Sequence, residues 1–321
     1  MELKILLESV IALLELFLFP GFLFLIFFSF FIEWLDRKMV AKFQNRYGPL
    51  HVGPKGILQP FADILKLLSK EDITPESANE IPFKLTPLLL FSFALTPLFC
   101  IPIISNSALI TFPTDLVIVI FLMSCIPVLS FIAAWVSTNR FSTIGGTRLA
   151  LQMFGYEIPL VLALVSPTIT TQTFSISKIV EWQMGNLWLF LIQPIGFAIA
   201  IICLLAHLQR LPFDMPEAET ELVGGWLVEF SGKKLALIKL TKSLELTLAA
   251  SLITSLYLGG PSFLVISHPV IYFLKIIVCV FIFANLKALF ARFRIDQFLV
   301  GAWKYLIPLA ILQIAMTQIL S

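Results

Sequence analysis

Five carboxylate residues lie close together in one polar stretch, LPFDMPEAETELVGGWLVEFSGKK, between two long apolar segments. They are Asp214, Glu217, Glu219, Glu221 and Glu229. Carboxylates at the edge of a membrane are costly to bury and commonly handle protons or ions. Because an acid and a proline suit a first helical turn, Asp214-Met-Pro-Glu217 predicts the start of a short helix, on which Glu217 and Glu221 share a face. The alternative is a solvated, capped loop helix without a role in charge transfer.

A second set of ionisable residues lies inside the apolar segments. Glu157, in LALQMFGYEIPLVLAL, falls near the middle of one segment, where it could gain and lose protons, and Tyr156 beside it can donate a hydrogen bond to it. The alternative is a static glutamate paired with an arginine of another helix. In KKLALIKLTKSLELTL, Lys239, Lys242 and Glu245 follow one another at three-residue steps, so that Lys242 and Glu245 could pair. Lys239 could simply extend its flexible side chain to the membrane–water interface.

The composition of the chain is that of a membrane protein. Of its 321 residues 59% are hydrophobic and only 13% are charged, and the mean hydropathy is +0.96. Soluble domains carry about 25% charged residues. We therefore expect one polytopic membrane domain over residues 1–321. The net charge of +2, without a basic patch interleaved with aromatic residues, excludes nucleic acid as a partner.

Eight apolar runs are long enough to cross a bilayer as helices, which takes about 20 residues. They predict an all-α integral membrane fold, and prolines inside them predict a kinked bundle. Since the first run lacks the basic start and short apolar core of a signal peptide, we expect it to be retained as a span. The runs are 9–32, 85–104, 115–137, 147–166, 187–208, 235–258, 268–290 and 301–320, and the prolines are Pro20, Pro97, Pro127, Pro159, Pro194 and Pro308.

Basic residues concentrate on the connections that follow the odd-numbered runs, among them the loop over residues 33–84 and the acidic loop over residues 209–235. Cytoplasmic loops are enriched in lysine and arginine. The pattern therefore predicts a multi-pass protein of the cell membrane with these connections in the cytoplasm and both termini outside. The basic residues are Arg37, Lys38, Lys42, Arg46, Lys55, Lys66, Lys70, Lys84, Arg140, Arg148, Arg210, Lys233, Lys234, Arg292, Arg294 and Lys304, against only Lys4 and Lys178 on the other side.

The first loop contains a helix too short to span a membrane. In ILQPFADILKLLSKE the apolar residues recur at helical spacing and the charged ones lie between them, which is typical of an amphipathic interfacial helix. One interpretation is a helix that merely lies on lipid. The bend RYGPLHVGPKG ahead of it is punctuated by glycine and proline, and this favours a shaped site instead.

The cysteines and histidines do not indicate a metal or redox centre. Cys100, Cys125, Cys203 and Cys279 are far apart inside apolar runs, and no pair has the C-x-x-C spacing of zinc or iron–sulfur sites. The three histidines are equally scattered, and the chain has neither an HExxH motif nor a nucleotide-binding glycine loop. We expect no cofactor, no metal and no catalytic residue in this chain alone.

The motifs together resemble the quinone-site membrane subunit of respiratory complex I, the NADH–quinone oxidoreductase chain 1, or H-subunit, family. The resemblance rests on four runs that keep the family's order over nearly the whole chain: RYGPLHVGPKGILQPFADILKLLSKED, GYEIP, PFDMPEAETELVGGWLVEFSG and FRIDQFLVGAWKYLIPLAI. Related families are the membrane subunits of energy-converting, group 4 membrane-bound hydrogenases and of ferredoxin-linked sulfane sulfur reductases.

The resemblance implies an eight-helix subunit on which a peripheral iron–sulfur module docks, and it assigns expected roles to individual residues. A proton relay or coupling path is expected at Glu157, Asp214, Glu217, Glu219, Glu221, Glu229, Lys242 and Glu245. A docking or acceptor-chamber surface is expected at Arg37, Arg46, His51, Asp63, Lys66 and Asp72 of the first loop and at Arg292, Arg294 and Asp296 of the last.

The chain departs from the respiratory pattern at two positions. Lys242 stands where the respiratory proteins usually have an acid, which resembles the hydrogenase branch. Leu50-His51 stands where they commonly have asparagine and a basic residue, although the VGPKG insert itself resembles the respiratory branch. The chain therefore resembles a form intermediate between the two.

The sequence thus predicts a non-redox subunit of a complex I-like, ion-translocating oxidoreductase, linked indirectly to ferredoxin. Its expected partners are membrane lipid, a peripheral iron–sulfur subunit, a hydrogenase-like large subunit, and antiporter-like and small membrane subunits. Iron–sulfur clusters, and a nickel–iron centre or a quinone, are expected in or near those partners. One alternative is the quinone-site subunit of an NADH- or F420-type quinone oxidoreductase. Another, of a different class, is a stand-alone ion-coupled transporter, although no internal repeat favours it.

Overall fold

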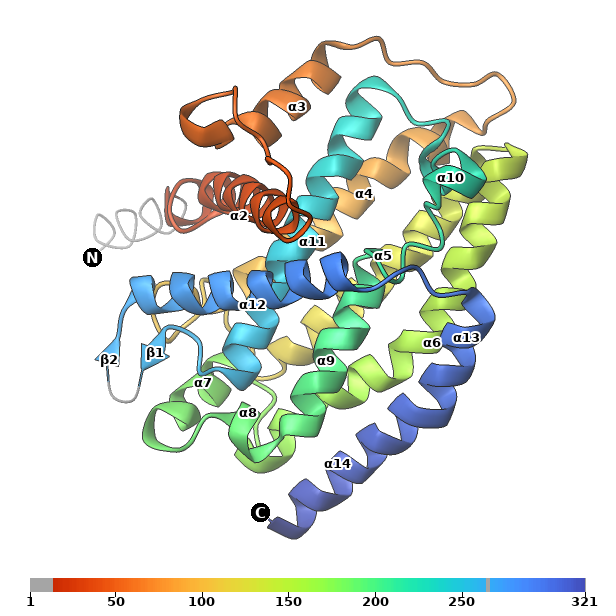
Figure 1. The fold of residues 1–321 in the computed structure, drawn as a ribbon. Coiled ribbons are helices and arrows are strands. Elements are labelled where there is room, and N and C mark those ends of the chain that lie inside the picture. Colours follow the sequence, from red (N-terminus) through yellow and green to blue (C-terminus); the bar gives the residue numbers. More distant parts are fainter. Residues whose placement is uncertain (1–13, 264–265, 321) are drawn as a thin grey trace.

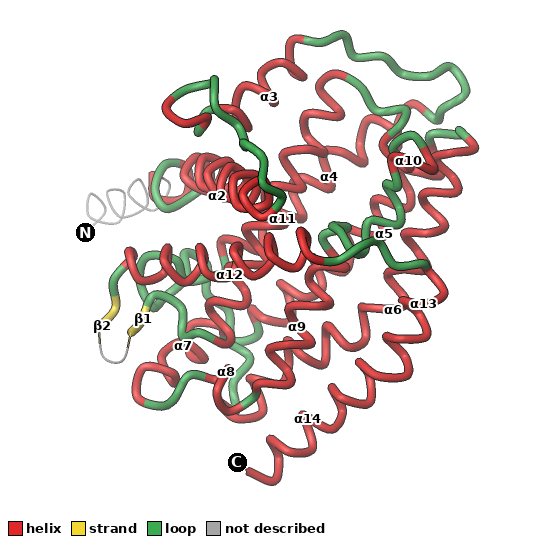
Figure 2. Tube along the Cα trace, viewed as in Figure 1, coloured by secondary structure: helices red, strands yellow, loops and turns green. Residues whose placement is uncertain are grey.

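The chain, as a computed structural model, is a bundle of helices, described over residues 14–263 and 266–320 apart from the side chains of Glu219, Phe263, Ile266, Ser267 and Leu320. The predicted all-α fold is confirmed (Figures 1 and 2). Within the described residues the β-structure is one antiparallel hairpin of two-residue strands, β1 (Ser262–Phe263) and β2 (Ile266–Ser267), with Ser262 opposite Ser267.

The long helices correspond to the predicted apolar runs. They are α2 (Phe22–Phe43), α4 (Glu80–Phe99), α5 (Asp115–Val136), α6 (Arg140–Thr171), α9 (Pro194–His207), α11 (Gly232–Tyr257), α12 (Pro269–Leu289) and α14 (Ile307–Leu320). Shorter helical segments lie between them: η1 (Pro54–Gly56), α3 (Gln59–Ser69), α7 (Ile176–Gly185), α8 (Leu189–Ile192), α10 (Glu219–Leu222), η2 (Gly225–Leu227), α13 (Ile295–Gly301) and η3 (Ala302–Leu306).

Six described helical stretches are long and apolar enough to cross a membrane, which agrees with a multi-pass membrane protein. They are Leu14–Phe43, Glu80–Phe99, Asp115–Val136, Arg140–Thr171, Pro269–Leu289 and Ile295–Ile319. The helix α9 is apolar but shorter, and α11 is long but carries Lys239, Lys242 and Glu245. The first predicted run, 9–32, begins outside the described residues, and its helix continues beyond the apolar run to Phe43.

The polar composition of α11 is explained by its position at the centre of the bundle (Figure 1). Every side chain from Ser243 to Tyr257 is buried. The helix packs against α4, α2, α3 and α12 along its length and against α7 and α9 near its end. Neighbouring helices rather than lipid surround it, so it can hold ionisable and hydroxyl groups that a lipid-facing helix would expose at high cost.

The predicted run 187–208 is interrupted by Pro194, which separates α8 from α9. Proline has no amide hydrogen and disfavours helical backbone at the preceding residue, so Gln193 leaves the helix. The fully buried Gln193 side chain accepts a hydrogen bond from the Ser166 hydroxyl and donates one to the Ser166 carbonyl oxygen at 3.2 Å. Of the predicted kinks, the one at Pro194 is thus a break in the helix, and the Gln193 side chain at the break is bound to Ser166 of α6.

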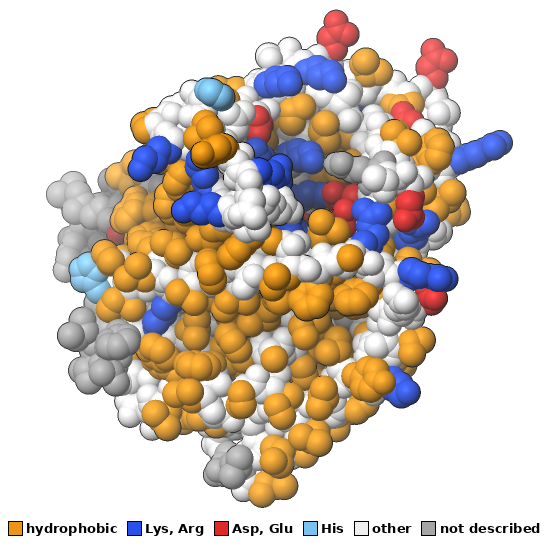
Figure 3. Space-filling model, in the orientation of Figure 1, with side chains coloured by type: hydrophobic (Ala, Val, Ile, Leu, Met, Phe, Trp, Pro, Cys, Tyr) orange, Lys and Arg blue, Asp and Glu red, His pale blue; other side chains and the backbone are white. Residues whose placement is uncertain are grey.

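The charged connections gather at one end of the bundle. Ion pairs join the first loop to α11 and the acidic loop to α6, α11 and the 290–294 connection. Figure 3 shows charged side chains concentrated around this end, whereas the flank below it is rich in hydrophobic side chains and carries few charged ones. The connections that follow the odd-numbered predicted runs therefore share one end, as expected; the side of the membrane on which they lie stays a prediction.

The helix predicted to begin at Asp214 is absent from the described structure of the acidic loop. Helical structure begins only at Glu219 and lasts one turn, as α10. Positive φ angles at Ala218 (21°) and Val223 (62°) bound this turn. A side chain at Gly225 would collide with the carbonyl oxygen of Pro216, so the loop doubles back on itself too tightly for a longer helix.

Candidate functional site: a charged chamber and the residues behind it

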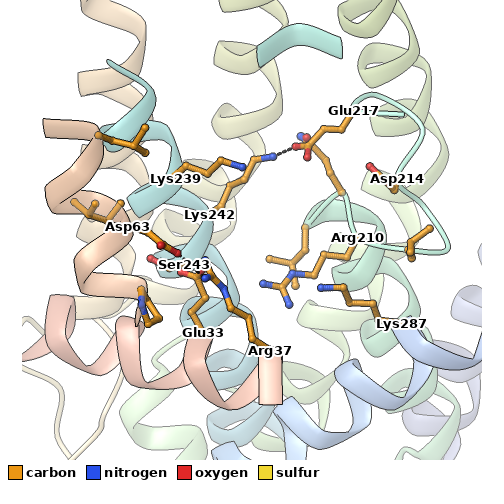
Figure 4. Close-up of a pocket in the computed structure, with 16 residues that line it drawn as sticks. Glu33, Arg37, Asp63, Arg210, Asp214, Glu217, Lys239, Lys242, Ser243 and Lys287 are labelled. Atoms are coloured by element: carbon orange, nitrogen blue, oxygen red, sulfur yellow. Dashed lines mark hydrogen bonds and ion pairs between the residues drawn. The ribbon is translucent and has the colours of Figure 1, made fainter. Parts of the chain in front are cut away.

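The acidic loop, α2, α3, α11 and α12 enclose a chamber of about 470 Å³ at the charged end (Figure 4). Its size is that of a small-ligand site. Apolar side chains from α3 and the 208–211 segment form part of the wall. The ionisable residues that line it are Glu33, Arg37, Asp63, Arg210, Asp214, Glu217, Lys239, Lys242 and Lys287.

The helix α3 forms one wall, and its two faces differ. On the inner face the Asp63 carboxylate accepts hydrogen bonds from Arg37 at 2.7 Å and from the Gln59 amide at 2.9 Å. On the outer face Leu65 and Leu68 are exposed, while Phe61 packs against aromatic rings of α2. The amphipathic helix predicted from the sequence therefore both presents apolar side chains outward and shapes the chamber.

Two acids of the acidic loop face the chamber. Asp214 accepts a hydrogen bond from Arg292 at 3.0 Å, and Glu217 forms an ion pair with Lys242 of α11. The Lys242 ammonium group also lies 5.6 Å from the centre of the Trp226 ring, at cation–π range. The sequence suggested Glu245 as the partner of Lys242; the ion pair found in the described structure is with Glu217.

The remaining acids of this loop lie elsewhere. Glu221 is bound by Arg148 at 2.6 Å and by Arg292 at 3.6 Å, and it does not share a face with Glu217. The hydrogen bond and charge of Arg148 lower the pKa of Glu221 below its ordinary value of 4.5. Glu229 accepts a hydrogen bond from the Asn139 amide at the start of α6. The side chain of Glu219 lies outside those that the structure describes.

The residues expected on the docking surface lie in five different places. Arg37 and Asp63 line the chamber; Arg292, Arg294 and Asp296 line a separate groove of about 700 Å³ beside Glu221. Asp72 binds Lys234 at 2.8 Å and so holds the first loop on α11. Arg46 lines a cleft of about 370 Å³ next to the chamber. His51 and Lys66 are exposed and lie on neither wall.

Sequence reasoning missed a buried charge cluster at the chamber floor. Asp36, only 2% exposed, lies 2.5 Å from Arg210 and 3.4 Å from Lys287, and it joins α2, the acidic loop and α12. The sequence feature that could have indicated the cluster is an acid near the end of an apolar run, Asp36 in FIEWLDRK. Its partners, Arg210 and Lys287, are far away in the sequence. From the sequence alone, Lys287 is interpreted as a lysine that extends its side chain to the membrane–water interface.

A series of ionisable groups leads from the chamber into the bundle. Lys242 interacts electrostatically with Glu245, which is 7% exposed. The Tyr156 hydroxyl of α6 lies within electrostatic range of Glu245 and Glu157 and 3.4 Å from His207 Nδ1.

Glu157 itself is bound by the Ser124 hydroxyl of α5. The arginine partner considered as an alternative for Glu157 is not found among its described contacts. No group of three or more His, Cys, Asp or Glu in the described part of the chain could hold a metal ion.

The fold and the chamber define a multi-pass α-helical membrane protein with an ionisable site at one end of the bundle. Residues 16–318 match the family model described as NADH dehydrogenase, and the chain belongs to this family. Its curated relatives are complex I membrane subunits, so the resemblance to the H-subunit family is confirmed. The expected kinship with hydrogenase and sulfur reductase subunits stays a prediction.

Two relatives illustrate the similarity. The chain is 40% identical over 292 residues to the H subunit of NADH-quinone oxidoreductase from Brevibacillus brevis, covering 89% of this chain and 86% of that protein. It is 35% identical over 285 residues to the protein of the same name from Dehalococcoides mccartyi strain CBDB1, covering 88% and 80% respectively.

Proposed function

We propose that this chain is the coupling and anchor subunit of a complex I-like, ion-translocating oxidoreductase. In this role the chain carries no electrons. Redox chemistry in a peripheral iron–sulfur module docked on the charged end changes the charge near the chamber, and protons then move along the ionisable groups toward antiporter-like subunits. Family membership supports the class of complex, because the relatives are subunits of an oxidoreductase.

The observation that carries the proposal is the continuity between the chamber and the bundle interior. The Glu217–Lys242 ion pair lies on the chamber wall, and Lys242 also interacts with buried Glu245 one turn further along α11. Two unit charges about 4 Å apart interact by roughly 4 kcal/mol at an effective dielectric constant near 20. A change of charge in the chamber is therefore large enough to change which of these groups holds a proton.

The donor that we propose is ferredoxin or a similar low-potential protein, acting through the peripheral module. What supports it is Lys242, which stands in the place of an acid of the respiratory pattern and pairs with Glu217. An assay of the isolated complex with reduced ferredoxin and with NADH as alternative donors tests this part separately. Turnover with NADH but not with reduced ferredoxin would contradict a ferredoxin-like donor.

A second candidate is a quinone site in the same chamber. Two observations favour it: the chamber volume of about 470 Å³ with Ile64, Leu67, Leu208 and Leu211 in its wall, and the names of the relatives. A quinone-site inhibitor should then protect Asp63 from a carboxyl-modifying reagent in the intact complex. Unchanged labelling of Asp63 at saturating inhibitor would contradict a quinone in this chamber.

The coupling role is tested by Glu157→Gln in the intact complex reconstituted into vesicles. We expect assembly and electron transfer to persist while proton or sodium uptake per electron is lost. Glu181→Gln is the matched control, because Glu181 is exposed on α7 at the other end of the bundle. Undiminished ion uptake in Glu157→Gln would overturn the proposal.

A further inference from the structure

His207, the last residue of α9, is a buried titratable group with half of its hydrogen-bonding capacity unused. Its side chain is 3% exposed. Nδ1 faces the Tyr156 hydroxyl at 3.4 Å, and Nε2 has no partner among the described residues. Buried polar atoms without partners are rare, and each one calls for an explanation.

The carboxyl group of Glu157, across a small space from His207, also has a buried polar atom without a hydrogen-bond partner. Oε1 contacts the Ser124 hydroxyl, whereas Oε2 is buried without a partner in the described structure. The Ser124 hydroxyl has one hydrogen and two acceptors in reach, Glu157 Oε1 and the Ile120 carbonyl oxygen at 3.0 Å. When the Ser124 hydroxyl donates to the Ile120 carbonyl oxygen, its contact with Glu157 is a hydrogen bond if Glu157 carries a proton and donates it to Ser124.

Glu157 and His207 line the same narrow space between α5, α6 and α9, together with Ser124 and apolar side chains of α5 and α6. The space is too small to hold a water molecule, which needs roughly 10–15 Å³ of room for its centre. A water bridge between the two groups is therefore excluded in this arrangement. The carboxyl group can reach the imidazole only by rotating its own side chain.

We propose that His207 is the proton-exchange partner of Glu157. The protonated carboxyl group of Glu157 rotates from Ser124 toward His207, and its proton passes to Nε2. Glu157 becomes a carboxylate and neutral His207 becomes an imidazolium, so the total charge inside the bundle does not change. The Nδ1 nitrogen carries its hydrogen before and after the transfer and donates it to the Tyr156 oxygen. The reverse transfer returns the proton to Glu157.

The exchange gives the path from the chamber a defined step between α9 and α6. Among the described ionisable groups, Tyr156 contacts His207, Glu157 lines the same space, and Glu245 lies within electrostatic range of Tyr156. A pair that exchanges a proton without changing its total charge avoids placing an uncompensated charge in the bundle, which would be costly. The inference rests on the proposed coupling role of Glu157.

The test compares two substitutions at one position in the intact complex, reconstituted into vesicles. His207→Gln preserves polarity but cannot carry the proton, whereas His207→Glu can. We expect ion uptake to fall roughly a hundredfold in His207→Gln, the lower end of the contribution of a positioned proton-transfer group, and to be largely restored in His207→Glu. His268→Asn, at an exposed histidine that caps α12, is the control.

Infrared difference spectroscopy of the wild-type complex with ring-labelled histidine supplies a second readout, which needs the two variants only to assign the bands. The carboxyl band absent from Glu157→Gln and an imidazole band absent from His207→Gln should change together during turnover. A carboxyl band that changes while the imidazole band stays constant would overturn the inference. Ion uptake at the wild-type level in His207→Gln would also overturn the inference. If Glu157→Gln had lost ion uptake in the same experiment, the coupling role of Glu157 would still stand. Loss of the coupling role itself would appear as normal uptake in Glu157→Gln.

Discussion

Lys242 of the central helix α11 forms an ion pair with Glu217 of the acidic loop. The pair joins the central helix, in which every side chain from Ser243 to Tyr257 is buried, to the acidic loop at the charged end of the bundle. Each side chain is about one-fifth exposed, at 23% and 21%. The pair is therefore close enough to solvent to respond to a change in the chamber, and close enough to Glu245 to transmit it.

Removing one member of this pair should cost more than removing both. Lys242→Met leaves the Glu217 carboxylate half-buried and unpaired, and we expect a loss of roughly 2 kcal/mol, less than the about 3–5 kcal/mol at a fully buried pair. The double variant Lys242→Met, Glu217→Gln should recover most of this loss. Thermal unfolding of the purified complex in detergent measures the cycle, and additive single effects would contradict a direct interaction.

Asp36 should be more important for stability than any other acid at the charged end. Asp36→Asn leaves Arg210 and Lys287 close together in a buried place with no carboxylate between them. We expect a loss of roughly 3 kcal/mol, seen as a lower midpoint of thermal unfolding. Asp296→Asn is the control, because Asp296 and its partner Arg294 are mostly exposed. Equal midpoints for the two variants would show that the buried cluster contributes nothing.

Much of the fold follows from the sequence because membrane helices are encoded locally. The apolar runs predicted the helices, and α3 followed from an apolar stripe at helical spacing. Two ends differ for identifiable reasons. The first run stops at residue 32, but helix-forming residues continue α2 to Phe43, and Glu33 and Arg37 of this extension line the chamber. The opposite happens in the acidic loop, where the residues around Gly225 prevent a helix at Asp214.

Partnerships across the chain could not be predicted in the same way. Lys242 and Glu217 are 25 positions apart and Asp36 and Lys287 are 251 apart, and no periodicity connects such pairs. The i,i+3 spacing suggested Glu245 as the ion-pair partner of Lys242, because such spacing relates only residues of the same helix. His207 was interpreted as an isolated residue, since its relation to Glu157 exists only where α5, α6 and α9 pack together.

The ion pair of Glu221 with Arg148 predicts a pH dependence of stability. Because the hydrogen bond from Arg148 lowers the pKa of Glu221 in the folded state, the stabilisation is present above the ordinary pKa of 4.5 and is lost as the pH falls through the lowered value. Glu221→Gln should weaken the dependence of the unfolding midpoint on pH below about 4.5.

The effect of Glu221 should be small and sensitive to salt, because the pair is largely exposed, at 32% for Arg148 and 51% for Glu221. Repeating the measurement at high salt supplies the control, since screening should make wild type and variant alike. If the unfolding midpoint of Glu221→Gln at low salt depended on pH as that of the wild type does, the Glu221–Arg148 pair would not be the cause of the pH dependence.

Lys234 should hold the end of the first loop against the bundle. Its buried ammonium group donates to Asp72 at 2.8 Å and to the Thr74 hydroxyl at 2.7 Å. We expect Lys234→Met to increase the rate of proteolytic cleavage between α3 and α4 several-fold, because the loop is then released more often. Lys66→Gln, at an exposed lysine of α3, should leave the cleavage rate unchanged. Equal cleavage in both variants would contradict the restraint.

The central claim is that charge in the chamber controls the protonation of Glu157. Time-resolved infrared spectroscopy of the working complex can follow the carboxyl band of Glu157 in wild type and in Lys242→Met. The account predicts that the band changes during each turnover of the wild type and is lost or strongly delayed in Lys242→Met, although electrons still flow. An identical change with identical timing in both would contradict it.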